Sequence, residues 1–459
     1  MIKTDLIIIG AGPGGYHTAY HAAKEGLTVA IFEDREVGGT CLNSGCIPTK
    51  TYCHFAEVVD SSRECAEFGL DNLKFDINFS KIHNRKNEVV SQLRSGIDML
   101  MQAPGITFVK GKASFKDTQT IICNNEEYQA KHIIIATGSH AKMPPIEGIN
   151  DPSVVTSTEL LDIDHVPTKL CIVGAGVIGM EFAAAFSTFG SEVTVIEFLK
   201  ECLPPIDSDI AKRLRKQLEK KGVKFYLQAG VKRIENGNVT FERKGKEETI
   251  LADTVLIATG RAANIEGLGL EAAGIEVDRK GIVVDEHFCT NVKNIYAIGD
   301  VNGKQMLAHA AEFQGYHVLN QILGHSDHIN FQIMPSAVFT NPEIAGVGLT
   351  EDQCKEQGLN YKCFKSLYRA NGKAVSMNAV DGLAKLITKE VDGKSYVIGC
   401  HVLGAHAADL VQEMTTVMND PQLSISDFNN VIHIHPTLSE ILHEAGLIAT
   451  SNSASFSTL

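Results

Sequence analysis

A glycine-rich turn between an apolar strand and a helix occurs twice in this chain, and this duplication limits the possible folds more than any other feature. The first copy is LIIIGAGPGG and the second is CIVGAGVIGME, and each is followed by a helical stretch and a second strand-like run. An acidic residue lies eighteen residues after the third glycine in both copies. The glycines and the acid are Gly10, Gly12, Gly15 and Glu33 in the first copy and Gly174, Gly176, Gly179 and Glu197 in the second.

This pattern is typical of a βαβ unit that binds a dinucleotide. The glycines allow a tight turn and a close approach of phosphate, the helix N-terminus faces the pyrophosphate, and the carboxylate binds ribose hydroxyls. Each unit also leads to a strand that ends in Ala-Thr-Gly, at Gly138 and at Gly260. The alternative is a pair of α/β units that bind no ligand. Because the carboxylate of Glu197 would repel a 2′-phosphate, we expect the second unit to prefer NAD to NADP, with Lys200 as the only nearby cation.

The length and charge of the chain indicate a large soluble protein. With 459 residues it is too long for one ordinary core, so three or four domains are expected. The net charge of −13 argues against nucleic acid and against an anionic membrane surface as partners. The short apolar run at the N-terminus leads straight into the first glycine turn, which indicates a buried strand. The sequence contains no stretch of eighteen apolar residues, so we expect no transmembrane helix. Eleven cysteines, an odd number without small-domain spacing, favour a reducing cytoplasm.

Two cysteines, Cys41 and Cys46 in GGTCLNSGCIPTK, follow the first nucleotide unit. Residues five apart in a regular helix lie roughly 8–9 Å apart, whereas a disulfide needs Cα atoms within about 7 Å. The pair can therefore close only where the helix is interrupted, and the residues around Gly45 allow this, while Pro48 is tolerated in a first helical turn. A labile disulfide at a helix start, beside a bound cofactor, indicates redox chemistry.

Two other interpretations of these cysteines are reduced, inert thiols and a metal site. Cys53 and Cys65 extend the run, but the spacing of the four residues fits neither zinc pairs nor the plant ferredoxin pattern. We therefore expect no metal.

The motif HIHPTLSE near the C-terminus contains a candidate base. Pro436 favours an extended backbone at His435, just before a helix that Thr437 can cap. Glu440 completes a capping box with Thr437, which is its structural interpretation. In the functional interpretation Glu440 orients the imidazole of His435, which then holds the proton of a thiol near neutral pH.

Composition shifts divide the chain into four predicted segments. A run rich in proline and glycine near residue 146 separates the two nucleotide units. The third segment contains NIYAIGDVNG, where Asp300 ends a strand and either binds a sugar hydroxyl or caps the next helix. The last nine residues, SNSASFSTL, have the composition of a disordered tail. The predicted segments are 1–145, 146–262, 263–332 and 333–459.

Across essentially its whole length the sequence resembles the pyridine nucleotide–disulfide oxidoreductases. The resemblance rests on GGTCLNSGCIPTK, the two glycine turns, the two Ala-Thr-Gly strands, YAIGD and HPTLSE, in the order of that family. It implies an α/β fold with two Rossmann-like domains, for FAD and for NAD(P), and a C-terminal α+β dimerisation domain. The implied FAD residues are Gly10, Gly12, Gly15, Glu33, Lys50, Gly138, Asp300 and Ala308. The implied NAD residues are Gly174, Gly176, Gly179, Glu181, Glu197 and Gly260, with Glu181 also as the ion-pair partner of Lys50.

The resemblance also implies an activity and an assembly. The expected reaction is oxidation of protein-bound dihydrolipoamide to lipoamide through Cys41 and Cys46, with reduction of NAD⁺ to NADH. The expected assembly is a homodimer in which His435 and Glu440 of one subunit complete the thiol site of the other, and the expected partner is the lipoyl-carrying protein of a 2-oxo acid dehydrogenase complex or of the glycine cleavage system.

Three other functions are weighed against this one. A glutathione-reducing enzyme linked to NADPH would carry arginines beside the second ribose, where this chain has Phe198, Leu199 and Lys200. A mercury-reducing enzyme would carry a C-terminal cysteine pair, which this chain lacks. A flavoprotein without turnover would be free to lose Cys46, His435 or Glu440, and all three are present.

Overall fold

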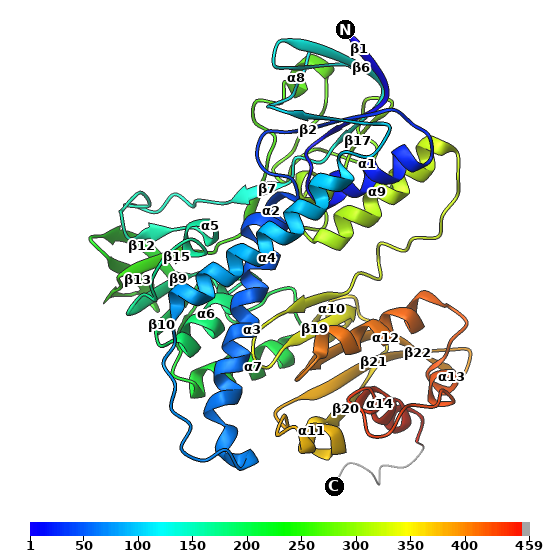
Figure 1. The fold of residues 1–459 in the computed structure, drawn as a ribbon. Helices are drawn as coiled ribbons and strands as arrows, with labels where there is room; N and C mark the ends of the chain where they lie inside the picture. The colour runs from blue at the N-terminus through cyan, green and yellow to red at the C-terminus, as the bar shows by residue number, and fades with distance from the viewer. Residues whose placement is uncertain (452–459) are drawn as a thin grey trace.

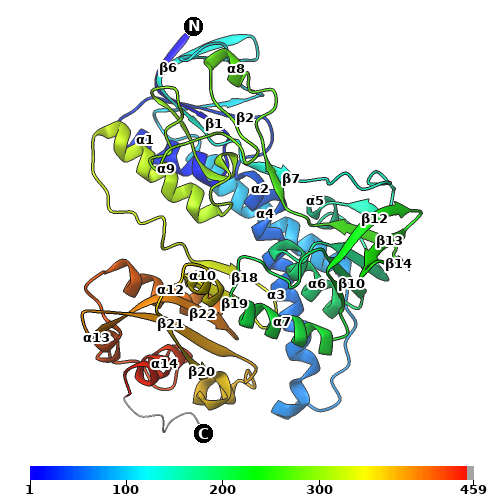
Figure 2. The same ribbon diagram turned by 180° about the vertical axis from the view of Figure 1, so that it is seen from behind.

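The computed structural model describes residues 1–451, so most of the predicted C-terminal tail lies outside the described residues. The chain forms three bodies, shown from two sides in Figures 1 and 2: an N-terminal body at the top, a second body beside it and a C-terminal body below. The predicted α/β fold is confirmed, with two mainly parallel sheets and a C-terminal antiparallel sheet. The predicted segment boundaries stay a prediction.

The N-terminal body is built on a seven-stranded sheet in the order β3-β2-β1-β6-β5-β4, with β17 paired to β6. Strands β3, β2, β1, β6 and β17 are parallel, as expected for strands joined by helical crossovers. Helices α1 and α9 pack on each other beside this sheet. The elements are β1 (Ile2–Ile9), α1 (Pro13–Lys24), β2 (Val29–Glu33), β3 (Ile106–Lys110), β4 (Ser114–Phe115), β5 (Thr120–Cys123), β6 (Glu126–Ile135), α8 (Leu270–Ala273), β17 (Ile295–Ala297), η2 (Gly299–Asn302) and α9 (Ala308–Leu323).

The second body repeats this plan on a five-stranded parallel sheet, β11-β10-β9-β15-β8, beside a three-stranded antiparallel sheet, β12-β13-β14. The two central strands of the parallel sheet, β9 and β15, are apolar and buried after their first residue, because both faces of a parallel sheet are covered. The elements are β8 (Val154–Val155), α5 (Ser157–Leu160), β9 (Lys169–Val173), α6 (Val177–Phe189), β10 (Glu192–Glu197), α7 (Ser208–Lys220), β11 (Lys224–Leu227), β12 (Ala229–Glu235), β13 (Asn238–Arg243), β14 (Lys246–Leu251) and β15 (Thr254–Ile257).

Three connections join these two bodies. Two of them are short strands, β7 (Ser139–Ala141) and β16 (Arg261–Ala263), each of which follows an Ala-Thr-Gly strand. These two strands pair antiparallel. Helix α3 (Cys46–Arg63), which follows α2 (Gly39–Ser44), descends from the N-terminal body to pack on α6, as Figure 1 shows. Tyr52 of α3 and Phe79 of α4 (Phe79–Leu100) are buried in the same core as Phe186. The residues at the start of α3 are thereby held between the two nucleotide units.

The C-terminal body is a five-stranded antiparallel sheet, β18-β19-β22-β21-β20, whose apolar face is covered by α12, α13 and α14. Its other face meets the second body through Leu383 and Leu403, which belong to the core of that body. No helix among residues 1–451 is long and apolar enough to cross a membrane. The elements are β18 (Ser336–Val338), β19 (Ile344–Gly348), α10 (Glu351–Glu356), β20 (Lys362–Leu367), α11 (Gly372–Ser376), β21 (Leu383–Val391), β22 (Lys394–Leu403), α12 (Ala407–Asn419), α13 (Ile425–Asn429) and α14 (Glu440–Thr450).

Candidate active site

The two glycine turns have the same geometry. Gly10 and Gly174 have φ values of +107° and +105°, which favour glycine, and both lie against the carbonyl of an alanine in the neighbouring Ala-Thr-Gly strand. A Cβ at Gly15 would overlap the carbonyl oxygen of Gly10, so the third glycine allows the helix to pack closely on the strand, as the dinucleotide fingerprint requires. At Gly176 a Cβ would meet no atom within 4 Å, which leaves the turn open to a ligand.

The acid after the second strand is fixed in the same way in both units. Glu33 Oε2 accepts a hydrogen bond from the backbone N–H of Ala11 at 2.8 Å, and Glu197 Oε2 accepts one from Ala175 at 2.6 Å. Each acid also accepts a bond from the backbone N–H two residues further on, at Arg35 and at Leu199. Each carboxylate is therefore held against its own glycine turn, where the ribose of a bound dinucleotide would lie.

One cleft of about 2600 Å³ runs past both turns and past the cysteine pair. This volume is large enough for more than one ligand of ordinary size. The predicted residues that line it are Gly10, Gly12, Glu33, Cys41, Cys46, Lys50, Gly138, Gly174, Gly176, Glu181, Glu197, Gly260, Asp300 and Ala308. Gly15 and Gly179 lie behind the turns, and His435 and Glu440 do not line the cleft of this subunit.

The cysteine pair lies where the helix is interrupted, as the sequence predicts. Helix α2 ends at Ser44 and α3 begins at Cys46, with Gly45 between them at φ −142° and ψ −112°. A Cβ on Gly45 would lie 2.8 Å from the carbonyl oxygen of Thr40, so only glycine fits this break without a shift of the backbone. Both cysteines are free thiols in this structure.

The two thiols differ in acidity because one donates a hydrogen bond to the other. The hydrogen bond from Cys41, followed by the positive charge of Lys50, outweighs burial and lowers the pKa of Cys46 to about 7. The same hydrogen bond, together with burial, raises the pKa of Cys41. Cys46 is therefore the more acidic thiol of the reduced pair and is about half ionised at neutral pH.

Lys50 lies one turn after Cys46 on α3, and an ion pair with a buried acid fixes its side chain. Its Nζ donates to both carboxylate oxygens of Glu181 on α6, at 2.8 and 2.9 Å, and lies 4.6 Å from the ring centre of Phe339. The carboxylate of Glu181 is almost fully buried and also accepts the backbone N–H of Phe339 at 2.9 Å. The expected Lys50–Glu181 pair is present, and it joins the helix of the thiols to the second nucleotide unit.

Replacing Lys50 with methionine is expected to make Cys46 less acidic. Loss of the ammonium removes a charge that favours the thiolate, so the pKa of Cys46 rises from about 7. Because one pKa unit changes the thiolate fraction by up to about tenfold, alkylation of the reduced protein by iodoacetamide at neutral pH slows by up to that factor. The pH dependence of alkylation measures this, with the exposed Lys81→Met on α4 as control. An unchanged pH profile in Lys50→Met would rule out the electrostatic role of Lys50.

Asp300 is held by two residues that were not predicted as site residues. Ser139 donates its hydroxyl to Asp300 Oδ2 at 2.5 Å, and Arg261 donates from Nε to the same hydroxyl oxygen at 2.7 Å. Arg261 also donates to the carbonyl of Ser139 at 2.7 Å. Each of the two follows the last glycine of an Ala-Thr-Gly strand. This equivalent position in the two repeats is the sequence signal that could have identified them as site residues. The network fixes Asp300 at the start of η2, beside Gly138 in the wall of the cleft.

His435 and Glu440 form the expected pair on the surface of the C-terminal body. His435 Nδ1 lies 2.9 Å from Glu440 Oε1, and the imidazole side chain is 79% exposed. The hydrogen bond from the backbone N–H of Thr437, followed by that from His435, lowers the pKa of Glu440. The predicted helix start at Thr437 is wrong: α14 begins only at Glu440, with Ser439 at its N-cap position. The hydroxyl of Thr437 donates to the carbonyl of Ile434, and its backbone N–H donates to Glu440 Oε2 at 2.8 Å.

Comparison with known protein families decides the relationship. Residues 4–315 match the family described as pyridine nucleotide-disulphide oxidoreductase, which is more than half of the chain. The chain belongs to this family. Residues 334–446 match the dimerisation domain of the same pyridine nucleotide–disulphide oxidoreductases, which supports a homodimer. The family uses FAD and NAD(H), and the two glycine turns that line the cleft, with their fixed carboxylates, fit two dinucleotides.

Individual oxidoreductases of this family are similar over nearly the full length. The dihydrolipoyl dehydrogenase of Chlamydia trachomatis is 40% identical, over 97% of this chain and 96% of the relative. That of Bacillus subtilis is 39% identical, over 98% of this chain and 97% of the relative. Among solved structures, the Cu(II) complex of RclA, an HOCl-induced flavoprotein disulfide reductase of Escherichia coli, has a TM-score of 0.87 at 32% identity, over 98% of this chain and 100% of the other.

Proposed function

We propose that this chain is a dihydrolipoyl dehydrogenase, which oxidises dihydrolipoamide to lipoamide and reduces NAD⁺ to NADH. The observation that carries the proposal is one cleft that joins a thiol pair of unequal acidity to two dinucleotide turns. Full-length identity of about 40% to enzymes of that name supports the choice of substrate.

Each site residue has a role in this proposal. In the first unit Gly10, Gly12 and Glu33 would hold FAD, together with Asp300, whose position Ser139 fixes. In the second unit Gly174, Gly176 and Glu197 would hold NAD, with Gly260 at the edge of the cleft. When bound, FAD supplies the two-electron chemistry that links the thiol pair to NAD⁺. Lys50 lines the same cleft as Cys46, and its positive charge helps to lower the pKa of that thiol.

The reaction at sulfur is thiol–disulfide exchange. Dihydrolipoamide gives one thiol proton to His435, and its thiolate attacks the Cys41 sulfur of the Cys41–Cys46 disulfide. The disulfide breaks, a mixed disulfide forms on Cys41, and Cys46 leaves as a thiolate, which its low pKa favours. The second thiol of the substrate then attacks its own mixed-disulfide sulfur, lipoamide leaves with an internal disulfide, and Cys41 takes a proton. The substrate loses two electrons, which the cysteine pair gains.

The base for this exchange would come from the other subunit. His435 is exposed and does not line the cleft that holds Cys41 and Cys46 in its own subunit. It is therefore not placed to take a proton from a substrate thiol in that cleft. In the homodimer it would face the thiol pair of the second copy. Glu440, hydrogen-bonded to Nδ1, would leave Nε2 to take the proton and would stabilise the imidazolium.

The partner in the cell would be a protein that carries a lipoyl group, in a 2-oxo acid dehydrogenase complex or in the glycine cleavage system. The names of the relatives support a lipoyl substrate and do not separate these two assemblies. We also propose a cytoplasmic location, on the basis of eleven free thiols in the described residues.

The test is steady-state formation of NADH from dihydrolipoamide and NAD⁺, with NADP⁺ as the other acceptor and with glutathione disulfide plus NADPH as the rival reaction. We expect fast turnover with dihydrolipoamide that is confined to NAD⁺. Turnover only with glutathione disulfide and NADPH would transfer the protein to another branch of the family. No turnover with FAD bound would favour a non-catalytic flavoprotein.

Replacing Glu197 with glutamine is expected to weaken the preference for NAD⁺ over NADP⁺. The amide keeps one hydrogen-bond acceptor for the glycine turn but loses the charge that binds ribose hydroxyls and repels a 2′-phosphate. The ratio of kcat/KM values for the two nucleotides should fall about tenfold or more, because a hydrogen bond to a charged group contributes about 1.5–3 kcal/mol. The exposed Glu192→Gln at the start of β10 is the control. A constant ratio in Glu197→Gln would contradict the assignment.

A further inference from the structure

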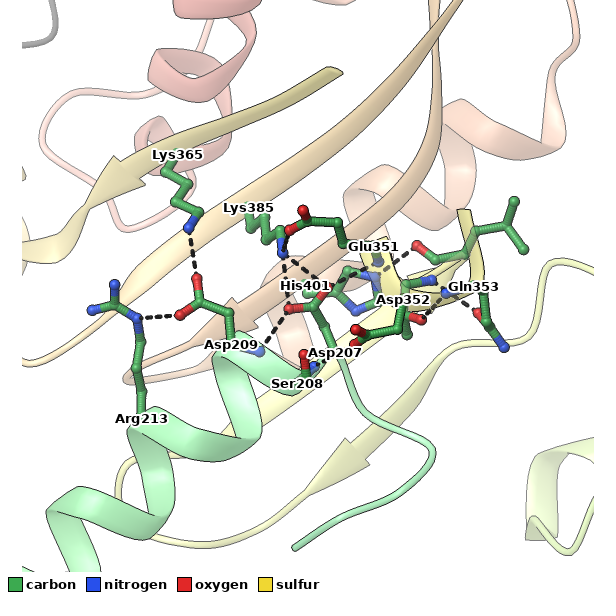
Figure 3. A network of polar contacts seen from close by, with 12 residues as sticks. Asp207, Ser208, Asp209, Arg213, Glu351, Asp352, Gln353, Lys365, Lys385 and His401 are labelled. Atoms are coloured by element: carbon green, nitrogen blue, oxygen red, sulfur yellow. Dashed lines mark hydrogen bonds and ion pairs between the residues drawn. The ribbon is translucent and has the colours of Figure 1, made fainter. Parts of the chain in front are cut away.

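A fully buried lysine of the C-terminal body forms ion pairs with two acids. Lys385 and Asp207 have no exposed side-chain surface, and Nζ of Lys385 donates to the Asp207 oxygens at 2.9 and 3.0 Å and to Glu351 Oε2 at 2.6 Å. Figure 3 shows the ammonium between the two carboxylates, with α7 on one side and the C-terminal sheet on the other. A buried charge is tolerated only when it is paired and hydrogen-bonded, and here all three donors of the ammonium are used.

The strand alternation explains why a lysine is buried at this position. Ala384 and Leu386 of β21 point into the core under α12 to α14. Lys385, between them, points to the opposite face, which meets the second body. Because an apolar residue would pack equally well at this position, we infer that the role of Lys385 is to pair with Asp207 and Glu351.

Asp207 connects this network to the wall of the cleft. It precedes α7 and accepts the backbone N–H of Asp209 with Oδ1 and that of Glu351 with Oδ2. The segment before it, residues 204–206, lines the cleft. One residue earlier, the backbone N–H of Leu203 donates to the carbonyl of Ala175 at 2.8 Å, inside the second glycine turn. The chain from Leu203 to Asp207 is therefore attached at one end to the nucleotide turn and at the other to Lys385.

We propose that Lys385 and Asp207 are positioning residues for the second nucleotide: they attach segment 203–207, and through it the turn at Ala175, to the C-terminal body. This inference rests on the proposed function, because it assigns the network to the NAD half of the cleft. It predicts a defect confined to the nucleotide step, since Lys50, one turn after Cys46, is held by a separate ion pair with Glu181.

The other charged groups at this junction form contacts of their own, and Asp352 accepts the backbone N–H of Ser208 at 3.3 Å. Asp209 accepts from Lys365 at 2.6 Å and from Arg213 at 3.1 Å, and Glu351 also pairs with Lys355. His401, on the same sheet face, lies 2.9 Å through Nε2 from the carbonyl of Leu349, and burial lowers its pKa. Hydrogen bonds from Lys355 and Lys385 lower the pKa of Glu351 to about 2, so this carboxylate stays charged at neutral pH.

The test compares Lys385→Met with Lys365→Met in the FAD-loaded full chain. Lys365 pairs with Asp209 at the same junction but is partly exposed, so it is the matched control. In Lys385→Met we expect KM for NAD⁺ to rise about tenfold with a much smaller change in kcat, because a misplaced wall weakens binding. Anaerobic reduction by dihydrolipoamide, measured without NAD⁺, should keep its wild-type rate. Lys365→Met should match the wild type in both measurements.

A second variant covers the risk that Lys385→Met fails to fold, because it leaves Asp207 buried without its cation. The double variant Asp207→Leu, Lys385→Met replaces both buried charges with apolar side chains of similar volume. We expect the same rise in KM for NAD⁺. A folded single or double variant with wild-type KM for NAD⁺ would overturn the proposal, as would an equal loss in the dihydrolipoamide step. Failure of the proposed function would show differently, as absent NAD⁺ turnover in the wild type.

Discussion

Replacing Cys46 with serine is expected to abolish oxidation of dihydrolipoamide by NAD⁺ while FAD stays bound. Serine cannot form the disulfide that accepts two electrons from the substrate, and no other thiol is placed to replace Cys46: Cys53 is two helical turns further along α3. The loss in kcat should be on the order of 10⁴-fold or more, as for removal of a covalent catalytic group. Steady-state NADH formation measures it, and the absorbance of bound FAD shows whether the cofactor site is intact.

Two comparisons make this prediction specific. Cys363→Ser in β20 removes a partly buried thiol of the C-terminal sheet and should leave turnover unchanged. Transfer of electrons from NADH to an artificial acceptor does not use the thiol pair, so Cys46→Ser should retain it. Normal dihydrolipoamide turnover in Cys46→Ser would refute the thiol relay.

Replacing His435 with glutamine is expected to slow reduction of the enzyme by dihydrolipoamide by about 10²–10⁴-fold, the usual contribution of a positioned general base. Glutamine keeps a hydrogen bond to Glu440 but cannot take the proton of the substrate thiol. The rate is measured by rapid mixing under anaerobic conditions without NAD⁺. Oxidation of the reduced enzyme by NAD⁺ should be much less affected, because it needs no substrate thiol.

The matched control is His165→Gln. His165 is also exposed and hydrogen-bonded to a neighbouring acid, Asp164, at 2.8 Å, but it lies in a loop of the second body. A mixture of Cys46→Ser and His435→Gln adds a test of the dimer. If His435 serves the second copy, mixed dimers place both defects at one site and leave the other site intact, so exchange of subunits should restore part of the activity. Undiminished reduction of His435→Gln alone would remove His435 from the mechanism.

Local features of the site could be predicted from the sequence because they depend on neighbours in the chain. The glycine turns, the acids after the second strands and the helix break at Gly45 follow from backbone conformation and short spacing. The hydrogen bond between His435 and Glu440 joins residues only five positions apart in the chain, so it depends on one short loop. The start of α14 was the exception: the helix begins at Glu440 with Ser439 at its N-cap position, and Thr437 belongs to the preceding loop, where its hydroxyl donates to the carbonyl of Ile434.

Contacts between distant segments could not be predicted in the same way. Ser139 reaches Asp300 across 161 positions, and Lys385 reaches Asp207 across 178. The first contact depends on β17 joining the N-terminal sheet beside β6, and the second on the docking of the C-terminal body on the second body. A serine or a lysine in a strand is more often a solvated residue. Lys385 in particular follows the alternation of β21 and, taken from its sequence alone, belongs on a solvent face. Only the docking of the second body on that face makes it a buried ion pair.

Membership of the family does not by itself set the direction in which electrons cross the thiol pair. The similarity to RclA is close in structure, and that protein is described as an HOCl-induced disulfide reductase. The direction in which electrons cross the thiol pair therefore distinguishes an enzyme that oxidises a dithiol from one that reduces a disulfide. Kinetics with dihydrolipoamide as the electron donor address this directly.

The most direct test of the central claim is an anaerobic titration of the FAD-loaded wild type with dihydrolipoamide, followed by NAD⁺. The thiolate of Cys46 beside the oxidised cofactor should produce a long-wavelength charge-transfer band after two electrons, and addition of NAD⁺ should bleach that band as NADH forms. A protein that binds FAD but shows no such band, or a band that NAD⁺ leaves unchanged, would contradict the account.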